Sequence, residues 1–253
     1  GTFDGGGHAV KNVVMDQDAI TMTETAAFGF FGRLYGATVR NFGIENGSVL
    51  NADTDHVGML AGYLSDAKVE NCFATGSVSA GGGNNVGGLV GQSRYESSKV
   101  SDCFFIGSVS ASSVSYAGGL VGSLESSSQT PQNCYAVATV EAAGAAVYPL
   151  APLAVNGCYD STLGPSAAGG GTGKTTAEMK TADTAALLND GGSAWTYDAG
   201  KNGGYPYLTV FADPADLYAA LAPDSETQNG VTAAVTFASS RFSSLASAMA
   251  SIT

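Results

Sequence analysis

The fold is decided by Asn71-Cys72-Phe73-Ala74-Thr75-Gly76-Ser77-Val78, because the pattern recurs 31 residues later as Asp102-Cys103-Phe104-Phe105-Ile106-Gly107-Ser108-Val109. The residue that marks each repeat stands at spacings of 29, 30, 31 and 31 residues, at Asn12, Asn41, Asn71, Asp102 and Asn133. A fixed period of this length is typical of stacked supersecondary units, none of which buries its apolar face alone. The sequence therefore predicts a repeat architecture.

Each repeat also contains an apolar box bounded by glycines. The clearest copies are Val57-Gly58-Met59-Leu60-Ala61-Gly62, Val86-Gly87-Gly88-Leu89-Val90-Gly91 and Ala117-Gly118-Gly119-Leu120-Val121-Gly122. Each box is interpreted as a short strand, with glycines where the chain turns sharply. A propeller blade needs about 40 residues and a leucine-rich repeat fewer than about 30. The prediction is an all-β fold, a parallel β-helix of about 30-residue coils.

Stacked coils place equivalent residues in columns. The expected interior columns are Val49, Val78, Val109 and Val140, and Leu60, Leu89, Leu120 and Leu150. The asparagines are expected to form an amide ladder at a corner. An aromatic column is formed by Phe73, Phe104, Tyr135 and Tyr159. Strand alternation counted from Val69 places Phe73 inside, provided that the corner does not change the parity. An outward column would instead form a strip suited to stacking on sugar rings.

The four cysteines are expected to be free. Cys72, Cys103 and Cys134 share one repeat position, and Cys158 is assigned to the same position in a shortened last repeat. Stacked parallel strands place such residues about 4.8 Å apart, slightly beyond the usual Cβ separation of a disulfide. A ladder of packed thiols is therefore favoured. No Cys-x-x-Cys pair supplies the ligand spacing of a metal site.

The repeats are assigned to residues 1–164, in units near 1–27, 28–56, 57–85, 86–116, 117–146 and 147–164. Residues 165–211 are predicted to form a small mixed α/β cap at the open end of the β-helix, with one helix from Thr176 to about Asn189. For residues 212–253 the expectation is a short helix from Asp213 to about Leu221, a strand at Val231–Phe237 and a weak helix at Phe242–Met249. This tail either links to another domain or packs back on the β-helix.

Two segments resemble ligand loops but have simpler interpretations. Ala168–Thr175 matches a relaxed phosphate-loop pattern, but no buried strand precedes it. Thr175 as N-cap with Glu178 three residues later predicts a capping box instead. Asn51–His56 begins like a calcium loop but lacks the sixth-position glycine and the twelfth-position glutamate. We therefore predict no catalytic, cofactor-binding or metal-binding residue.

The remaining charged and titratable residues do not change that prediction. The charged residues at matching repeat positions, Lys11, Arg40 and Glu70, have mixed signs and indicate a solvated strand edge. No column of acidic residues of the kind used by polysaccharide-cleaving β-helices is present. The histidines, His8 and His56, occupy different repeat positions. The chain is accordingly expected not to be an enzyme.

Charge and hydropathy limit the partners. The formal net charge of −12 argues against nucleic acid and anionic lipid surfaces. No apolar run approaches about 18 residues, so membrane insertion is not expected. The first residues, Gly1–Gly5, look like the middle of a repeat. A longer parent chain with other domains is therefore expected.

The repeats resemble the GLUG-motif family of bacterial surface and secreted proteins. The resemblance depends on Gly88–Gly91, Gly119–Gly122, Asn71–Ala74 and Asn133–Ala136, on a lead-in coil at Phe3–Val10 and on an ending at Asn202–Leu208, and it covers roughly residues 1–210. It implies a right-handed parallel β-helix in large extracellular, host-associated proteins, including stalks beside immunoglobulin-cleaving metallopeptidases. Departures from the pattern, at Asp102, Pro131, Pro149 and Pro152, imply that the helix loosens or ends near residues 150–165.

The functional expectation follows from the repeat and the resemblance. The chain is predicted to be a non-enzymatic structural or adhesion module of a bacterial protein, located at the cell surface or outside the cell. Its expected partners are unidentified host glycans or proteins. The alternative is a carbohydrate-binding module or a polysaccharide-active β-helix enzyme. No cofactor is expected for the favoured function.

Overall fold

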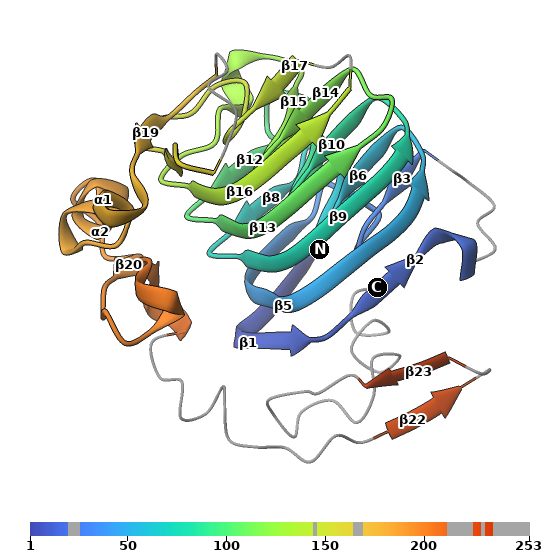
Figure 1. Ribbon diagram of the computed structural model, residues 1–253, viewed down its shortest axis with the longest axis horizontal. Helices are drawn as coiled ribbons and strands as arrows, with labels where there is room; N and C mark the ends of the chain where they lie inside the picture. Colours follow the sequence, from blue (N-terminus) through green and yellow to red (C-terminus); the bar gives the residue numbers. More distant parts are fainter. Residues whose placement is uncertain (20–25, 144–145, 164–168, 212–224, 229–230, 235–253) are drawn as a thin grey trace.

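The computed structural model describes residues 1–19, 26–143, 146–163, 169–211, 225–228 and 231–234. Most of the strands pair in parallel, and the chain winds into a parallel β-helix in which equivalent stretches of successive repeats lie side by side (Figure 1). In this register Val78 pairs with Val49 on one side and Val109 on the other, and Val109 pairs with Val140. The predicted fold and coil length are confirmed.

The largest sheet contains the strands on either side of the asparagine corner. It has ten strands. They are β1 (Thr2–Lys11), β2 (Val14–Asp16), β5 (Thr38–Asp53), β8 (Lys68–Glu70), β9 (Phe73–Gly82), β12 (Lys99–Ser101), β13 (Phe104–Ala111), β16 (Tyr135–Ala142), β18 (Cys158–Asp160) and β19 (Thr172–Lys174). Strand β5 runs through its corner without interruption, whereas later coils divide into a short strand before the corner and a longer one after it. A short 3₁₀ turn, η1 (Gln17–Ala19), follows β2.

The glycine boxes form two further sheets. The five-stranded sheet contains β3 (Ala27–Phe28), β6 (His56–Gly58), β10 (Asn85–Gly87), β14 (Tyr116–Gly118) and β17 (Ala146–Tyr148). The four-stranded sheet contains β4 (Arg33–Tyr35), β7 (Ala61–Ser65), β11 (Val90–Arg94) and β15 (Val121–Leu124), which precedes the 3₁₀ turn η2 (Ser127–Gln129). Each box therefore forms two strands rather than the single strand expected. The glycines allow this close packing, because a Cβ on Gly58 would lie 2.5 Å from the carbonyl oxygen of Ala61.

The interior of the β-helix is filled by the predicted columns. Every leucine of the box column is fully buried, and the valine column is at most 7% exposed. Both columns belong to one continuous hydrophobic cluster that extends from Val10 to Ala151. Stacking of like side chains thus buries an apolar face that no single coil could bury, as the repeat period requires.

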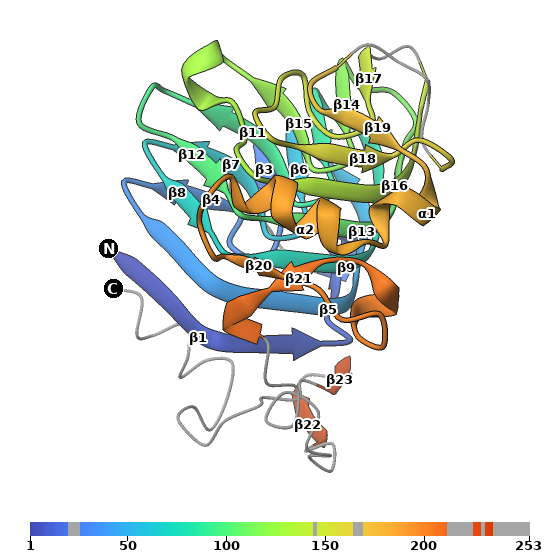
Figure 2. The same cartoon turned by 90° about the vertical axis from the view of Figure 1, so that its left-hand side faces the viewer.

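The C-terminal cap (residues 176–211) combines short helices and strands. Its elements are α1 (Thr176–Met179), α2 (Ala182–Asn189), β20 (Trp195–Thr196), η3 (Asn202–Gly204), β21 (Tyr207–Leu208) and η4 (Thr209–Phe211). The single helix expected at 176–189 is two helices, because Thr181 caps a new helix by accepting a hydrogen bond from the Thr184 amide. The cap lies along the flank of the β-helix (Figure 2), and η4 contacts β1 of the first coil. It therefore covers a side of the stack rather than only its open end.

Parts of the predicted tail lie outside the described residues. These are the helix at 213–221, the weak helix at 242–249 and the end of the strand predicted at 231–237. Strands β22 (Ser225–Gln228) and β23 (Val231–Ala234) pair antiparallel. Within the described part of the chain, no helix has the length and apolar character needed to cross a membrane.

Candidate functional site

The aromatic column lies on the outer face of the largest sheet. Phe73, Phe104 and Tyr135 stack with successive ring centroids 4.9 Å apart and ring planes within 4° of each other. They belong to a hydrophobic cluster separate from the interior of the β-helix. The prediction that this column faces inward is therefore wrong.

The asparagine corner explains the outward orientation. Val69 and Cys72 are both fully buried although they are three residues apart. Between them Asn71 adopts a left-handed conformation with φ of 52°, which shifts the alternation of inward and outward side chains by one residue. Phe73 is therefore directed outward and Ala74 inward.

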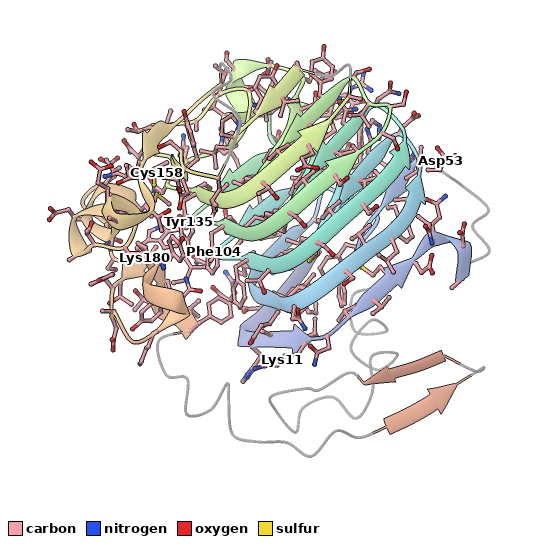
Figure 3. The ribbon with its side chains drawn as sticks, in the orientation of Figure 1. Lys11, Asp53, Phe104, Tyr135, Cys158 and Lys180 are labelled. Carbon is pink, nitrogen blue, oxygen red and sulfur yellow. The ribbon has the colours of Figure 1, made fainter. Side chains whose placement is uncertain are left out.

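The cap covers the aromatic column (Figure 3). The ring of Phe211 meets Phe73 edge-on at 4.9 Å, and the Trp195 ring lies 5.3 Å from that of Tyr135. The Tyr135 hydroxyl donates to the carbonyl oxygen of Pro206 at 2.8 Å and accepts from Asn202 Nδ2 at 3.0 Å. Tyr135 is completely buried. The column is thus an internal interface and not an open strip for sugar rings.

The last coil is one residue out of the predicted alignment. Tyr135 pairs with Cys158, and Ala136 pairs with Tyr159. Cys158 therefore occupies the aromatic position beneath the cap, and Tyr159 is not part of the aromatic column. Asn156 supplies the corner of this coil, with φ of 50°, and Gly157 follows it where earlier coils have cysteine. The sequence contained this signal, because Asn156 stands two residues before Cys158 instead of one.

The other three cysteines form the predicted ladder of free thiols. Cys72, Cys103 and Cys134 are buried and unpaired. Each thiol donates to the carbonyl oxygen two residues earlier, at 3.2, 3.1 and 3.0 Å respectively. Burial raises the pKa of the Cys103 thiol well above its ordinary value, and burial also raises the pKa of Cys158, to about 12. These thiols are inert packing groups rather than nucleophiles.

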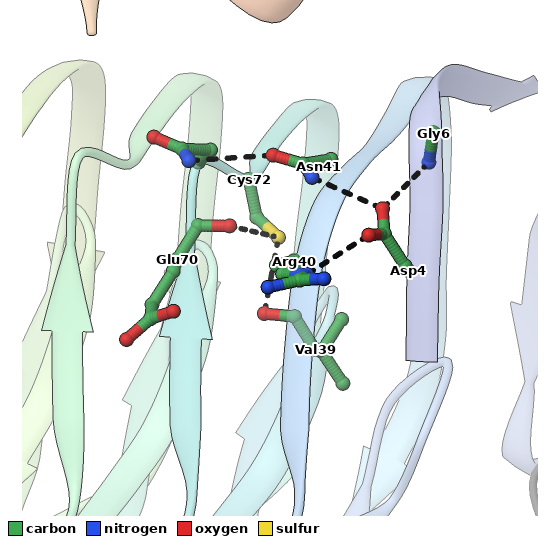
Figure 4. Close-up of polar contacts among 8 residues, drawn as sticks. Asp4, Gly6, Val39, Arg40, Asn41, Glu70 and Cys72 are labelled. Atoms are coloured by element: carbon green, nitrogen blue, oxygen red, sulfur yellow. Dashed lines mark hydrogen bonds and ion pairs between the residues drawn. The ribbon is translucent and has the colours of Figure 1, made fainter. Parts of the chain in front are cut away.

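An amide ladder runs along the corner (Figure 4). Asn71 Nδ2 donates to Asn41 Oδ1 at 3.3 Å, and Asn41 Nδ2 donates to Asp4 Oδ1 at 3.0 Å. Asp4 therefore begins this ladder in place of Asn12. An irregularity of β1 between Asp4 and His8 shifts the later pairing, so that Asn12 bonds with Asn46 instead.

The ladder resumes on the other side of Asp102. Asn133 Nδ2 donates to Asp102 Oδ1 at 3.3 Å, and Asn156 Nδ2 donates to Asn133 Oδ1 at 3.4 Å. Ionised Asp102 has no proton to donate, and no described residue donates to Asn71 Oδ1. The row of side-chain hydrogen bonds is therefore interrupted between Asn71 and Asp102.

The segments that resemble ligand loops are occupied by structural hydrogen bonds. Glu178 Oε2 accepts from the Thr175 amide at 2.8 Å, and Thr175 Oγ1 accepts from the Glu178 amide at 3.3 Å. This confirms the capping box. In the calcium-like segment, Asn51 donates to Asp16 and the Asp53 amide donates to Gln17. Within the described ranges, His, Cys, Asp and Glu side chains nowhere gather in threes to hold a metal ion.

Charged residues near the corner form ion pairs between coils. Lys11 Nζ lies 3.0 Å from Glu45, and Arg40 Nε lies 2.9 Å from Asp4. Both pairs are partly exposed, as expected of a solvated strand edge. Such pairs contribute about 0–1 kcal/mol each.

A different surface gathers aromatic and cationic side chains. We call it the tyrosine–arginine surface, and its residues come from β4, β6, β7, β10 and β11: Arg33, Tyr35, His56, Tyr63, Asn85 and Arg94. Parallel pairing aligns Arg33 with Tyr63, and His56 with Asn85. Stacked coils thus place the six side chains beside one another.

Tyr63 lies at the centre of this surface. Its ring centroid is 5.0 Å from that of His56 and 6.4 Å from that of Tyr35. The guanidinium carbon of Arg33 lies 5.7 Å from the Tyr63 ring centroid, within cation–π range. The surrounding side chains leave Tyr63 only 8% exposed, whereas Tyr35 is 60% exposed.

The two arginines have different partners. Arg94 Nε lies 2.6 Å from Glu125 in an ion pair. Arg33 donates to the Tyr35 hydroxyl at 3.0 Å, and it forms no ion pair with any carboxylate of the described residues. Arg33 is therefore a cation held in place by neutral groups.

Titration at this surface follows from burial. Burial lowers the pKa of His56, and Arg33 and Arg94 lower that pKa further, against the opposing effect of Asp55. His56 is therefore neutral at pH 7, and its Nδ1 shares a hydrogen bond of 2.9 Å with Asn85. This surface was not predicted from the sequence, since its residues differ from coil to coil. The sequence signal that could have identified the surface is the position of its residues in the repeat. Arg33, Tyr35, Tyr63 and Arg94 stand one or three residues after the last glycine of their boxes, where side chains point outward.

Comparisons with known proteins support the fold. No family model matches the sequence. A stretch of 98 residues, 38% of this chain, is 38% identical to Halomucin of Haloquadratum walsbyi. The chain matches about 1% of the length of that relative.

A crystal structure described as that of a "putative immunoglobulin A1 protease" from Bacteroides ovatus is similar in fold. The TM-score is 0.56 at 19% identity, and the match covers 82% of this chain and 77% of the other. This finding overturns the prediction that the chain is not an enzyme, because a chain of the same fold carries the description of a protease. At this identity the likeness shows the fold alone and assigns no catalytic residue.

Proposed function

We propose that this chain is a rigid β-helical module of a large secreted or cell-surface protein, in which it presents or spaces other domains. One observation carries the proposal: the cap spans the stack along its flank. It contacts β1 through η4, meets Phe73 through Phe211, and packs around Cys158 in the last coil. A stack clamped in this way keeps its shape as a unit, whereas an ordinary solenoid depends on contacts between neighbouring coils.

The comparisons support an extracellular setting. Halomucin is far longer than this chain, which agrees with a module within a large parent protein. The formal charge of −12 and the small number of cations suit a solvated surface that does not aggregate. Membership of the GLUG-motif family remains part of this proposal, supported by the equivalent positions of Gly88–Gly91 and Gly119–Gly122 in the structure.

The location is tested by surface proteolysis of intact cells of the source organism. An antibody raised against residues 1–211 detects the module before and after protease treatment, and an intracellular protein serves as the control. We expect the signal to disappear from intact cells, or to be present in the culture medium, while the control protein survives. Detection only after lysis would refute the proposal.

An adhesive role is the finer part of the proposal. It requires that the module itself binds a surface ligand, in addition to holding other domains apart. Beads coated with residues 1–211 are expected to attach to a mucin-coated surface more strongly than beads coated with an unrelated acidic protein. Equal attachment of both beads would refute the adhesive role.

A further inference from the structure

We propose that the tyrosine–arginine surface binds the terminal sialic acid of a glycan, with the sugar carboxylate on Arg33 and a face of the sugar on exposed tyrosine. This goes beyond the proposed role as a module, which requires no ligand. The surface lies on the glycine-box sheets, whereas the cap covers the outer face of the largest sheet.

Charge is the first argument. The chain has 22 acidic and 10 basic side chains, and the ion pairs of the described residues involve Lys11, Arg40 and Arg94. Arg33 is one of several cations that form no ion pair with a described residue, and Tyr35 and Tyr63 hold its guanidinium in place. Guanidinium groups bind carboxylates through paired, charge-assisted hydrogen bonds. Arg33 therefore offers a position for one external carboxylate.

The number of available cations identifies the kind of acidic sugar. Arg94, the second guanidinium of the surface, already pairs with Glu125 at 2.6 Å. A polyuronate or a sulfated glycan carries charges along the chain and needs a row of cations. A sialic acid at the end of a glycan has a single carboxylate, which matches Arg33, the one guanidinium of the tyrosine–arginine surface that forms no ion pair with a described residue.

The neutral groups around Arg33 suit a sugar ring. Tyr35 is 60% exposed and its hydroxyl is fixed by Arg33, so the ring is available to the C–H groups of a sugar without large loss of side-chain entropy. The half-buried His56 lies beside Tyr63 and is hydrogen-bonded to the buried Asn85. An imidazole held in this way offers its other ring nitrogen to a sugar hydroxyl.

Strands β7 and β11 have no open edge, because β7 pairs with β4 and β11, and β11 pairs with β7 and β15. Strand β4 is the edge of this sheet in the described part of the chain. A peptide added there would bind through its backbone, whereas a glycan must be recognised by side chains. The nearby carboxylates are engaged as well: Asp55 accepts from Asn84 at 2.7 Å, and Glu125 pairs with Arg94.

The test uses isothermal titration of the full chain with sialyllactose, lactose and an oligoglucuronate. We expect saturable binding of sialyllactose with a dissociation constant on the order of 1 mM or tighter, and at least about tenfold weaker binding of lactose. Equal binding of lactose would overturn the proposal, because the carboxylate would then contribute nothing. Tighter binding of the oligoglucuronate would also overturn it in favour of a polyanion surface.

Variants locate the site. Arg33→Gln is expected to weaken sialyllactose binding about tenfold or more, as loss of a charge-assisted contact requires, and Tyr35→Ala is expected to weaken it several-fold. The matched control is Arg40→Gln, which removes a partly exposed arginine near the asparagine corner and should leave binding unchanged. Thermal melts show whether each variant is folded. A folded Arg33→Gln variant with wild-type affinity, or full competition by an oligoglutamate peptide, would refute the assignment.

Discussion

Asp102→Asn is expected to stabilise the protein at neutral pH. Every other rung on this part of the ladder is an asparagine that donates to the preceding coil, at 3.3 Å for Asn71 and 3.4 Å for Asn156. Asparagine at position 102 would accept from Asn133, as Asp102 does, and would also donate to Asn71 Oδ1. The backbone needs no adjustment, because φ of 51° at this position is readily adopted by asparagine.

The expected gain is about one hydrogen bond. A net intramolecular hydrogen bond contributes about 0.5–1.5 kcal/mol to the free energy of unfolding. In a domain of this size, 1 kcal/mol raises Tm by about 2–4 °C. Removing a partly buried carboxylate acts in the same direction, since burial raises the pKa of Asp102 and the nearby Glu70 adds to that rise.

The pH dependence gives this prediction its sharpest test. Burial raises the pKa of Asp102, although the hydrogen bond from Asn133 opposes the rise. The folded protein therefore binds this proton more readily than the unfolded chain, and Asp102 reduces stability as pH rises through its folded pKa. Protonated Asp102 can also donate to Asn71. The advantage of Asp102→Asn should thus be largest at pH 7 and should shrink near pH 3.5, below the ordinary aspartate pKa of about 3.9.

The assay is urea unfolding of both proteins at the two pH values, followed by circular dichroism. The control is Asn133→Asp, which removes the donor to Asp102 and places two carboxylates on neighbouring rungs. It should lower the free energy of unfolding at pH 7. If Asp102→Asn were destabilising at pH 7, or equally stabilising at both pH values, the account of the interrupted ladder would be wrong.

Three further predictions concern the cap and the coils. Tyr135→Phe should lower the free energy of unfolding by about 0.5–1.5 kcal/mol, because the Pro206 carbonyl loses one of its two donors and keeps only Asn202 Nδ2; unchanged urea unfolding would contradict this. Gly76→Ala should cost more than about 3 kcal/mol, since φ is 133° and the new Cβ would collide with the Gly47 carbonyl, and wild-type Tm would refute it. Burial raises the pKa of Asp160, but hydrogen bonds from Thr162, Thr176 and Tyr205 outweigh it and the net pKa is lowered. Ionised Asp160 therefore stabilises the folded protein above its unfolded pKa, and this stabilisation is lost as the pH falls through its folded pKa. Trp195 fluorescence should report a loosening of the cap at acid pH in the wild-type protein that the Asp160→Asn variant does not show.

The repeat period predicted the fold and the interior columns, because identical spacing forces like residues to stack. It did not predict which way the aromatic column faces. Alternation along a strand is a local rule, and the left-handed conformation of Asn71 reverses it at the corner. The predicted alignment of the last coil was wrong because it matched Cys158 to the other cysteines. Cys158 stands two residues after Asn156, as Tyr135 stands after Asn133, and the two residues pair. A shift of one residue along a strand places each side chain on the opposite face.

The candidate surface was less predictable than the fold. Arg33, Tyr63 and Arg94 come from three different coils and share no motif. Only the close stacking of the glycine boxes brings them together. The position of the cap over the aromatic column could not be predicted from local sequence patterns either, because contacts such as that of Tyr135 with Pro206 join residues that are 71 positions apart.

The flank position of the cap fixes the number of coils beneath it. Repeat proteins often gain or lose units by duplication and deletion, since each unit contacts only its neighbours. Here Trp195 lies 5.9 Å from Phe104 and 5.3 Å from Tyr135, which belong to adjacent coils. An extra coil between them would separate these rings by about another 4.8 Å, and Trp195 could then pack on only one of them. Lengthening this module therefore requires a new coil outside the capped region, or a redesigned cap.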